Sequence, residues 1–351
     1  MSPGELNDRE EQILQAVVHT YVTTAEAVGS RTIVKRYSLD LSPATVRNVM
    51  ADLEESGYLQ QLHASSGRVP TDQGYRYYVD YLMRVQQLSL AERARIERDL
   101  SERLNDIDQA MQQTSHLLAL VSHQMGIVEA PTESDAEVRR IELMPVSGTR
   151  LAVMIADNYG RVRTIMLSLE ESIDVEDLPK LSRFLNENFY AAPLDSLASR
   201  VRMQLRTLMD EQRRLAEQAL RVLSVLPAAR PGQLFLEGAT QLFEYPEFKD
   251  VEKAQEVFNL LEERERVVEL LRAGIAKDTP FGPTVVIGSE AMGRGVDGIS
   301  IVASPYRVGE KTVGMLGVLG PRRMPYSRLT ALVDFTAQAL SRFLTRLAPG
   351  D

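Results

Sequence analysis

The most constraining feature of the 351-residue chain is the stretch from Ser42 to Leu59. Ser42 is a favourable helix N-cap, Pro43 suits the first helical position, and Gly57 is typical of a residue that ends a helix. Between them, apolar residues recur at helical spacing and form one stripe: Val46, Val49, Met50 and Leu53. The stretch therefore predicts a helix with one face buried in a core.

The opposite face of this helix carries polar side chains near its N-terminus. Thr45, Arg47 and Asn48 lie off the apolar stripe. Short polar groups and a guanidinium at this end of a helix suit base edges and phosphates in the major groove of DNA. We therefore predict a recognition helix in which these three residues contact bases or nearby phosphates, while Ser42 caps the helix and contacts a phosphate.

The residues before this helix complete a helix-turn-helix pattern. Asn7 and Glu10 have the spacing of a capping box, and an apolar helical face follows them. A second, short helix is expected from Ser30. It carries Arg31, Lys35 and Arg36, and we expect Arg31 and Arg36 to hold backbone phosphates, which would position the protein without reading sequence.

A two-stranded hairpin, or wing, is predicted after Gly57. Residues 58–63 and 68–70 are strand-like, and the tip between them is small and polar. Arg68 is expected to enter a neighbouring groove, with His63 and Ser65 as further DNA contacts. Three helices, a hairpin and a closing helix capped by Thr71 make a winged helix.

Charge leaves a second interpretation of this segment open, a winged helix that docks on protein. Residues 1–86 hold 8 Lys and Arg against 11 Asp and Glu, a net charge of −3. A DNA-binding domain usually shows a basic footprint. Here the footprint has to be concentrated locally around a few cations: Arg31, Lys35, Arg36, Arg47 and Arg68.

Composition sets wider limits on the chain. The formal net charge of −9 argues against a general binder of polyanions or membranes, and the length suggests two or three domains. Cysteine is absent, which excludes disulfides, thiolate nucleophiles and cysteine zinc sites. The first residues lack an export signal and no apolar run approaches a membrane span, so we expect a cytoplasmic protein with no membrane partner.

The remainder predicts an α+β protein. After a polar helical stretch at 88–125, strand patterns occur in two groups, and a closing helix covers 326–347. The groups are 140–146, 150–156 and 162–169, then 284–287, 298–306 and 312–319. We assign them to one antiparallel sensor-type domain that is split in the sequence. The mainly helical block between them is interpreted as an insertion with dimer contacts. The expected domains are 1–86, 87–191, 192–277 and 278–351.

No motif for catalysis, a cofactor or a metal emerges. The G-x-G-x-x-G spelling at 293–298 precedes a strand instead of a helix, so we interpret it as a loop. His116 and His123 have no acidic partner in metal-binding spacing. Arg322 and Arg323 lie in a predicted strand-to-helix turn, and a site for an anion or a partner there is the less favoured interpretation.

Four long motifs resemble the HrcA family of heat-inducible transcription repressors. They are Ser42–Gly57, the wing Leu62–Thr71, the tract Gly74–Asp80 and the turn Gly320–Met324. In the wing, His63, Ser65, Gly67 and Arg68 agree with the family pattern. Leu62, Ala64 and Ser66 depart from it, and Arg322 stands where the family commonly has threonine.

The resemblance implies a homodimer with a winged helix, a domain similar to GAF sensor domains and an inserted dimerising domain. Members of the family bind an inverted repeat in double-stranded DNA upstream of chaperone operons, and their activity depends on the GroEL chaperonin. The nearest alternative is a repressor that responds to a small molecule, similar to IclR-type regulators. An enzyme that uses the winged helix for docking, or a chaperonin-associated module, fits the residues less well.

Overall fold

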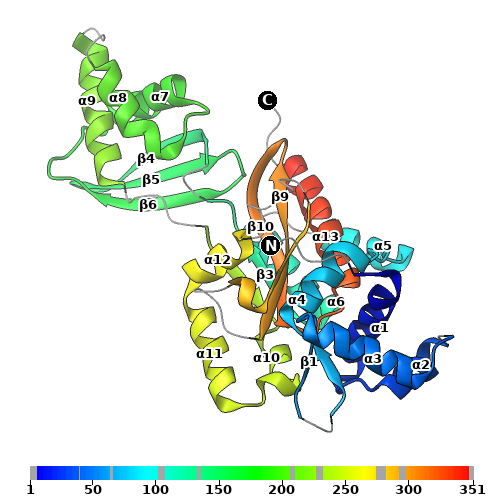
Figure 1. The fold of residues 1–351 in the computed structure, drawn as a ribbon. Coiled ribbons are helices and arrows are strands. Elements are labelled where there is room, and N and C mark those ends of the chain that lie inside the picture. Colours follow the sequence, from blue (N-terminus) through cyan, green and yellow to red (C-terminus); the bar gives the residue numbers. More distant parts are fainter. Residues whose placement is uncertain are drawn as a thin grey trace.

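The computed structural model describes residues 6–38, 40–63, 66–101, 107–132, 136–205, 210–226, 232–273, 282–291 and 298–347. They form an N-terminal winged helix, a central domain around a five-stranded sheet, and an inserted domain around a three-stranded sheet. Figure 1 shows the inserted domain and the winged helix at opposite ends of the molecule, with the central domain between them.

The winged helix has the predicted elements in the predicted order. They are α1 (Asp8–Thr24), α2 (Ser30–Tyr37), α3 (Pro43–Glu55), β1 (Leu59–Gln61), β2 (Arg68–Pro70), α4 (Asp72–Tyr77) and the π-helical turn η1 (Tyr78–Leu82). Strand β1 pairs antiparallel with β2. The capping box predicted at α1 is present, because Asn7 accepts from the amide of Glu10 at 3.1 Å and the Glu10 carboxylate accepts from the amide of Asn7 at 2.9 Å.

The central domain is built on an antiparallel sheet with the strand order β7-β3-β10-β9-β8. Its strands are β3 (Met125–Glu129), β7 (Leu234–Glu237), β8 (Thr284–Ile287), β9 (Ile299–Val308) and β10 (Lys311–Pro321). Its longer helices are α5 (Leu90–Ser101), α6 (Ile107–Ser122), α11 (Val251–Glu262), α12 (Arg264–Arg272) and α13 (Tyr326–Leu347), and its short ones are α10 (Ala239–Leu242), η4 (Pro246–Phe248) and η5 (Gly288–Ala291).

Both faces of the five-stranded sheet are buried. On β10, Leu316 and Val318 point to the core shared with α6 and α13, whereas Met315 and Leu319 point to a second core shared with α10–α12. Such alternation follows from the two-residue repeat of a strand, which sends successive side chains to opposite faces. The first core continues without interruption into the winged helix.

The inserted domain consists of one sheet with helices on one face (Figure 1). Its strand order is β4-β5-β6. Its elements are β4 (Val138–Ser147), β5 (Arg150–Asp157), β6 (Val162–Ser168), α7 (Leu178–Phe189), η3 (Leu194–Ser196), α8 (Leu197–Gln204) and α9 (Asp210–Val225). The domain leaves the central sheet after β3 and returns at β7, and these two strands are hydrogen-bonded neighbours.

The prediction of a single split sheet is therefore wrong. Strands β4–β6 form a sheet of their own, while β7 and α10–α12 belong with the central sheet. The sequence places the insertion at 192–277 and gives it helices, but in the structure it begins after β3 and also contains all three strands of the first predicted group. The error arose at β3, which is buried at every position and so shows no alternation that separates it from the helical stretch before it.

Within the described residues, no helix is both long and apolar enough to cross a membrane. The G-x-G-x-x-G spelling at 293–298 lies outside the described residues, except for its last glycine.

Candidate nucleic-acid interface

Helix α3 presents the exposed face that its sequence predicted. Val46, Val49, Met50 and Leu53 are buried, and the opposite stripe is exposed: Ala44, Arg47, Asn48 and Ala51. The two alanines keep this stripe shallow, so that Arg47 and Asn48 project beyond their neighbours. A guanidinium and an amide are the groups that pair bidentately with guanine and adenine edges.

The C-terminal half of α3 has the opposite charge. Asp52 and Glu55 are exposed there. Carboxylates repel phosphates, so a DNA duplex is disfavoured along this half of the helix. Of the two halves of α3, the first therefore suits a polyanion better, and in DNA-binding winged helices that half is the part that enters the groove.

Ser42 and Thr45 organise the beginning of α3. The Ser42 hydroxyl accepts from the Thr45 amide at 3.1 Å and lies 2.9 Å from the Thr45 hydroxyl. Thr45 is half-buried and its hydroxyl contacts that of Ser42, whereas Ser42 itself is exposed. The predicted N-cap is confirmed. The positive end of the helix dipole at this position favours a phosphate.

The cations of α2 face solvent. Arg31, Lys35 and Arg36 are exposed, while Ile33 is buried against α1 and α3. The hydroxyl of Tyr37, at the end of α2, lies 2.7 Å from Nδ1 of His19 on α1. These contacts fix the helix that carries the cations. Contact of Arg31 and Arg36 with phosphates remains a prediction.

A single-residue β-bridge, which the sequence did not predict, joins the wing to the segment before α2. Val28, before α2, exchanges backbone hydrogen bonds with Arg68, each of 2.9 Å. Gly67 is required at this crossing because a Cβ atom there would lie 2.5 Å from the Val28 carbonyl oxygen. At the tip, Ser66 donates to the carbonyl of His63 at 2.8 Å, and His63 is exposed. Ser65 lies outside the described residues.

Arg68 points to α3 instead of to solvent. Its Nε donates to the Glu54 carboxylate at 2.8 Å, and only 16% of its side chain is exposed. The sequence predicts Arg68 in a groove of DNA and indicates no role for Glu54. No spacing in the sequence indicates this pair, because it joins two elements through the tertiary fold.

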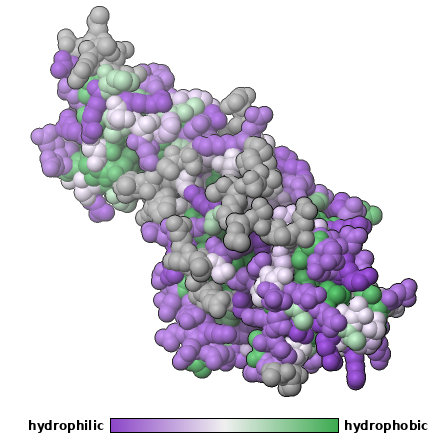
Figure 2. Space-filling view, in the orientation of Figure 1, coloured by the Kyte–Doolittle hydropathy of each residue, from purple (hydrophilic) through white to green (hydrophobic). Residues whose placement is uncertain are grey.

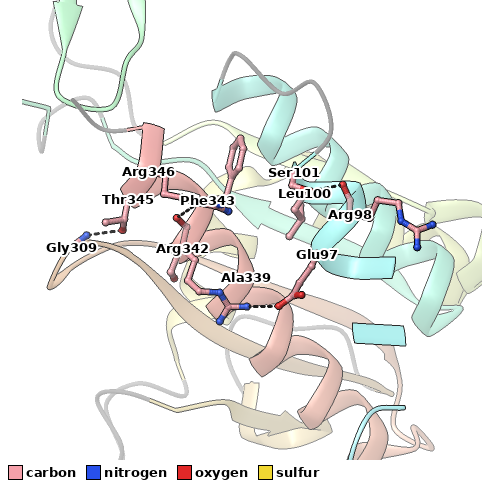
Figure 3. Close-up of a pocket in the computed structure, with 11 residues that line it drawn as sticks. Glu97, Arg98, Leu100, Ser101, Gly309, Ala339, Arg342, Phe343, Thr345 and Arg346 are labelled. Atoms are coloured by element: carbon pink, nitrogen blue, oxygen red, sulfur yellow. Dashed lines mark hydrogen bonds and ion pairs between the residues drawn. The ribbon is translucent and has the colours of Figure 1, made fainter. Parts of the chain in front are cut away.

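A groove of about 820 Å³ lies on the central domain between α5 and α13 (Figure 3). Its polar groups are largely engaged within it, since Arg342 donates to Glu97 at 3.1 Å and Thr345 accepts from the Gly309 amide at 3.0 Å. Arg98 points away from the groove in this view (Figure 3). The groove is therefore a weak candidate for the convergent polar pocket that a small-molecule sensor requires.

The described residues contain no group of three or more His, Asp or Glu side chains placed to hold a metal ion. His116, on α6, is exposed and lies 4.0 Å from the half-buried Glu237 on β7.

The N-terminal domain has three packed helices, of which the third has one exposed face, and a two-stranded wing. This is the architecture of a winged-helix transcription regulator. The family model described as the HrcA protein C-terminal domain matches residues 108–330. The chain is 39% identical over 340 residues to the heat-inducible transcription repressor HrcA of Geobacter sulfurreducens, covering 97% of this chain and 98% of that protein. It is 36% identical over 348 residues to the HrcA of Pelotomaculum thermopropionicum, covering 99% of each.

The chain therefore belongs to the HrcA family of heat-inducible transcription repressors, and it is a negative regulator of heat-shock transcription. A solved structure described as a hypothetical protein aligns with a TM-score of 0.65 at 22% identity. That alignment covers 98% of this chain and 100% of the other, so the two share their fold over the whole length.

Proposed function

We propose that two copies of the chain bind an inverted repeat upstream of a chaperone operon and block its transcription. The observation that carries the proposal is the exposed stripe of α3, where Arg47 and Asn48 project between two alanines. Arg47 and Asn48 read bases, Arg31 and Arg36 hold phosphates, and the start of α3 at Ser42 and Thr45 faces a phosphate. His63 and Ser65 supply wing contacts, and Arg68 supplies another when it leaves its ion pair with Glu54.

The proposed homodimer forms through the inserted domain. The sheet face away from α7–α9 has an apolar row across all three strands, because Met144 pairs with Ala152 and Ala152 pairs with Met166. Met144 and Met166 are 39% and 48% exposed. Figure 2 shows hydrophobic residues at the surface of this domain, at the upper left. Methionine-rich apolar surfaces of this kind suit a protein partner, and a second copy satisfies the twofold symmetry of an inverted repeat.

Release on heat stress is assigned to the GroEL chaperonin. In this scheme the chaperonin maintains the repressor, and misfolded proteins that occupy the chaperonin on heating withdraw that support. The family membership of the chain supports this step. The protein acts on cytoplasmic DNA and needs no cofactor for it.

A second candidate is a repressor controlled by a small molecule bound to the central domain, which then acts as a GAF-like sensor. The groove between α5 and α13 supports it. The pairing of Arg342 with Glu97 inside that groove makes it the weaker candidate.

Transcription in vitro from a chaperone-operon promoter tests the proposal. We expect the protein to lower transcript yield, GroEL to strengthen this repression, and an unfolded polypeptide that saturates GroEL to relieve it. A control template with a scrambled repeat should be transcribed equally with and without the protein. Repression of both templates, or a GroEL effect that the unfolded polypeptide does not reverse, would contradict the scheme.

A further inference from the structure

The turn between β10 and α13 contacts the winged helix directly. Arg322 in this turn donates from Nη1 to the Asp72 carboxylate at 2.8 Å, and Asp72 is the first residue of α4. The other Asp72 oxygen accepts from the amide of Ser289, in η5, at 2.8 Å. Partial burial alone would raise the pKa of Asp72, but the hydrogen bonds from Ser289 and Arg322 hold it below its ordinary value. Asp72 is thus a charged group held from two sides by the central domain.

One helical turn further along α4, Arg76 makes a second ion pair of opposite polarity. Its Nε and Nη2 bind both oxygens of the Glu290 carboxylate, and Nη2 also donates to the carbonyl of Val285 at 2.6 Å. On the winged helix the acid Asp72 precedes the base Arg76. On the central domain a base, Arg322, faces that acid, and an acid, Glu290, faces that base. Sliding either domain along the other would place like charges together, so the crossed pairs admit one register.

Aromatic and backbone contacts complete this surface. Between the two ion pairs, Tyr75 packs edge-on against Tyr326 with ring centroids 5.9 Å apart, and both rings are buried. Beyond η1, the amide of Gln86 donates to the carbonyl of Ser327 at 3.2 Å, so the chain follows the start of α13. Arg323, the neighbour of Arg322, is itself held by Glu247 on η4. We call the contacts of Asp72, Tyr75 and Arg76 with the central domain the α4 junction.

We propose that the α4 junction fixes the angle between α3 and the central domain and thereby sets the spacing of the half-sites that a dimer binds together. The inference rests on the proposed function, since spacing has meaning only for two linked copies on an inverted repeat. Asp72 and Arg76 are positioning residues, because neither belongs to the stripe on α3. A dimer meets both half-sites only when its recognition helices match their separation, and the gain from double engagement is lost when they do not.

The experiment compares full-length variants on duplexes that differ in spacer length. The proteins are the wild type, Arg76→Glu, Glu290→Arg, the double reversal Arg76→Glu/Glu290→Arg, and the milder Asp72→Asn. The duplexes carry a chaperone-operon inverted repeat with its natural spacer, with one or two base pairs added or removed, or with a single half-site. Affinities are measured by fluorescence anisotropy at one salt concentration, and circular dichroism verifies that each variant is folded.

The wild type should favour the natural spacer by roughly a hundredfold, the advantage expected of double engagement. Each single reversal and Asp72→Asn should flatten this preference and leave half-site affinity unchanged. The double reversal should recover part of it, because Asp80 and the Val285 carbonyl, which also bind Arg76, then face a carboxylate. A single reversal that keeps the wild-type profile, a double reversal that recovers none of it, or an equal loss on the half-site would overturn the inference. A wild type that does not distinguish the repeat from a scrambled duplex would instead overturn the proposed function.

Discussion

Arg68 of the wing and Glu54 of helix α3 form an ion pair, with Nε 2.8 Å from the carboxylate oxygen. The pair ties the wing to the helix beside it. It also engages the guanidinium that the sequence assigned to DNA. A partly exposed pair of this kind contributes up to about 1 kcal/mol to stability. Its larger effect is to decide whether Arg68 is available to a phosphate.

Replacing Glu54 with glutamine should therefore strengthen DNA binding. The change removes one negative charge and releases Arg68. The matched control is Glu55→Gln, which removes the same charge from the exposed end of α3. If Arg68 then contacts a phosphate, the slope of log affinity against log salt should be steeper by about 1 in Glu54→Gln than in Glu55→Gln. Equal slopes in a salt titration of the two variants would show that Arg68 does not reach DNA.

Tyr75 and Tyr326, whose rings pack edge-on, provide a matched pair of variants for stability measurements. The hydroxyl of Tyr75 is buried and has no hydrogen-bond partner among the described residues, whereas that of Tyr326 lies 3.0 Å from the Ser300 hydroxyl. Tyr75→Phe should leave the free energy of unfolding unchanged or slightly higher, and Tyr326→Phe should lower it by about 1–3 kcal/mol. Urea unfolding of both variants measures the difference. A larger loss in Tyr75→Phe would refute the assignment of the two hydroxyls.

A substitution at Met166 tests dimerisation through the face of the β4–β6 sheet that points away from α7–α9. Met166→Asp places a charge in the apolar row and should convert the dimer to a monomer in sedimentation velocity. Met203→Asp, at a 72% exposed position on α8 of the same domain, is the control and should remain dimeric. A dimeric Met166→Asp variant would move the interface elsewhere.

Glu129 on β3 should make stability decline with rising pH. Burial raises the pKa of its carboxyl, and the opposing contacts with Arg272 and the amide of Met315 do not cancel this. Because the folded pKa is the higher one, the contribution of Glu129 to stability is complete below the ordinary glutamate value of about 4.3 and is lost as pH rises through the folded pKa.

Glu129→Gln removes this titration, so its stability relative to the wild type should increase from about pH 4 to pH 7. Thermal unfolding across this range measures the change, and Glu262→Gln, at an exposed end of α11, reports the effect of net charge alone. A difference between Glu129→Gln and wild type that is constant with pH would contradict the assigned direction.

The sequence predicted most elements because their signals are local. The caps at Asn7 and Ser42, the apolar stripe of α3 and the turn at Gly57 all act within a few residues of one another. Each is present in the structure, and the exposed position of Arg47 follows from them directly.

The contacts that the sequence did not reveal join distant segments. Arg322 and Asp72 are 250 positions apart, and neither the sign nor the spacing of local charges indicates their pairing. The prediction of which strands share a sheet failed for the same reason. An alternating pattern identifies a strand such as β6 but does not indicate which sheet that strand joins, and β3, which is buried at every position, shows no alternation.

Fluorescence anisotropy of the wild type and Arg47→Ala with an inverted-repeat duplex tests the central claim, sequence reading by α3. A scrambled duplex at the same salt is the DNA control, and Arg202→Ala, at an exposed position on α8, is the charge control. We expect the wild type and Arg202→Ala to favour the repeat strongly. Arg47→Ala should lose about 1–3 kcal/mol for each half-site and remain dimeric. Unchanged affinity of Arg47→Ala for the repeat would contradict the assignment of α3 as the recognition helix.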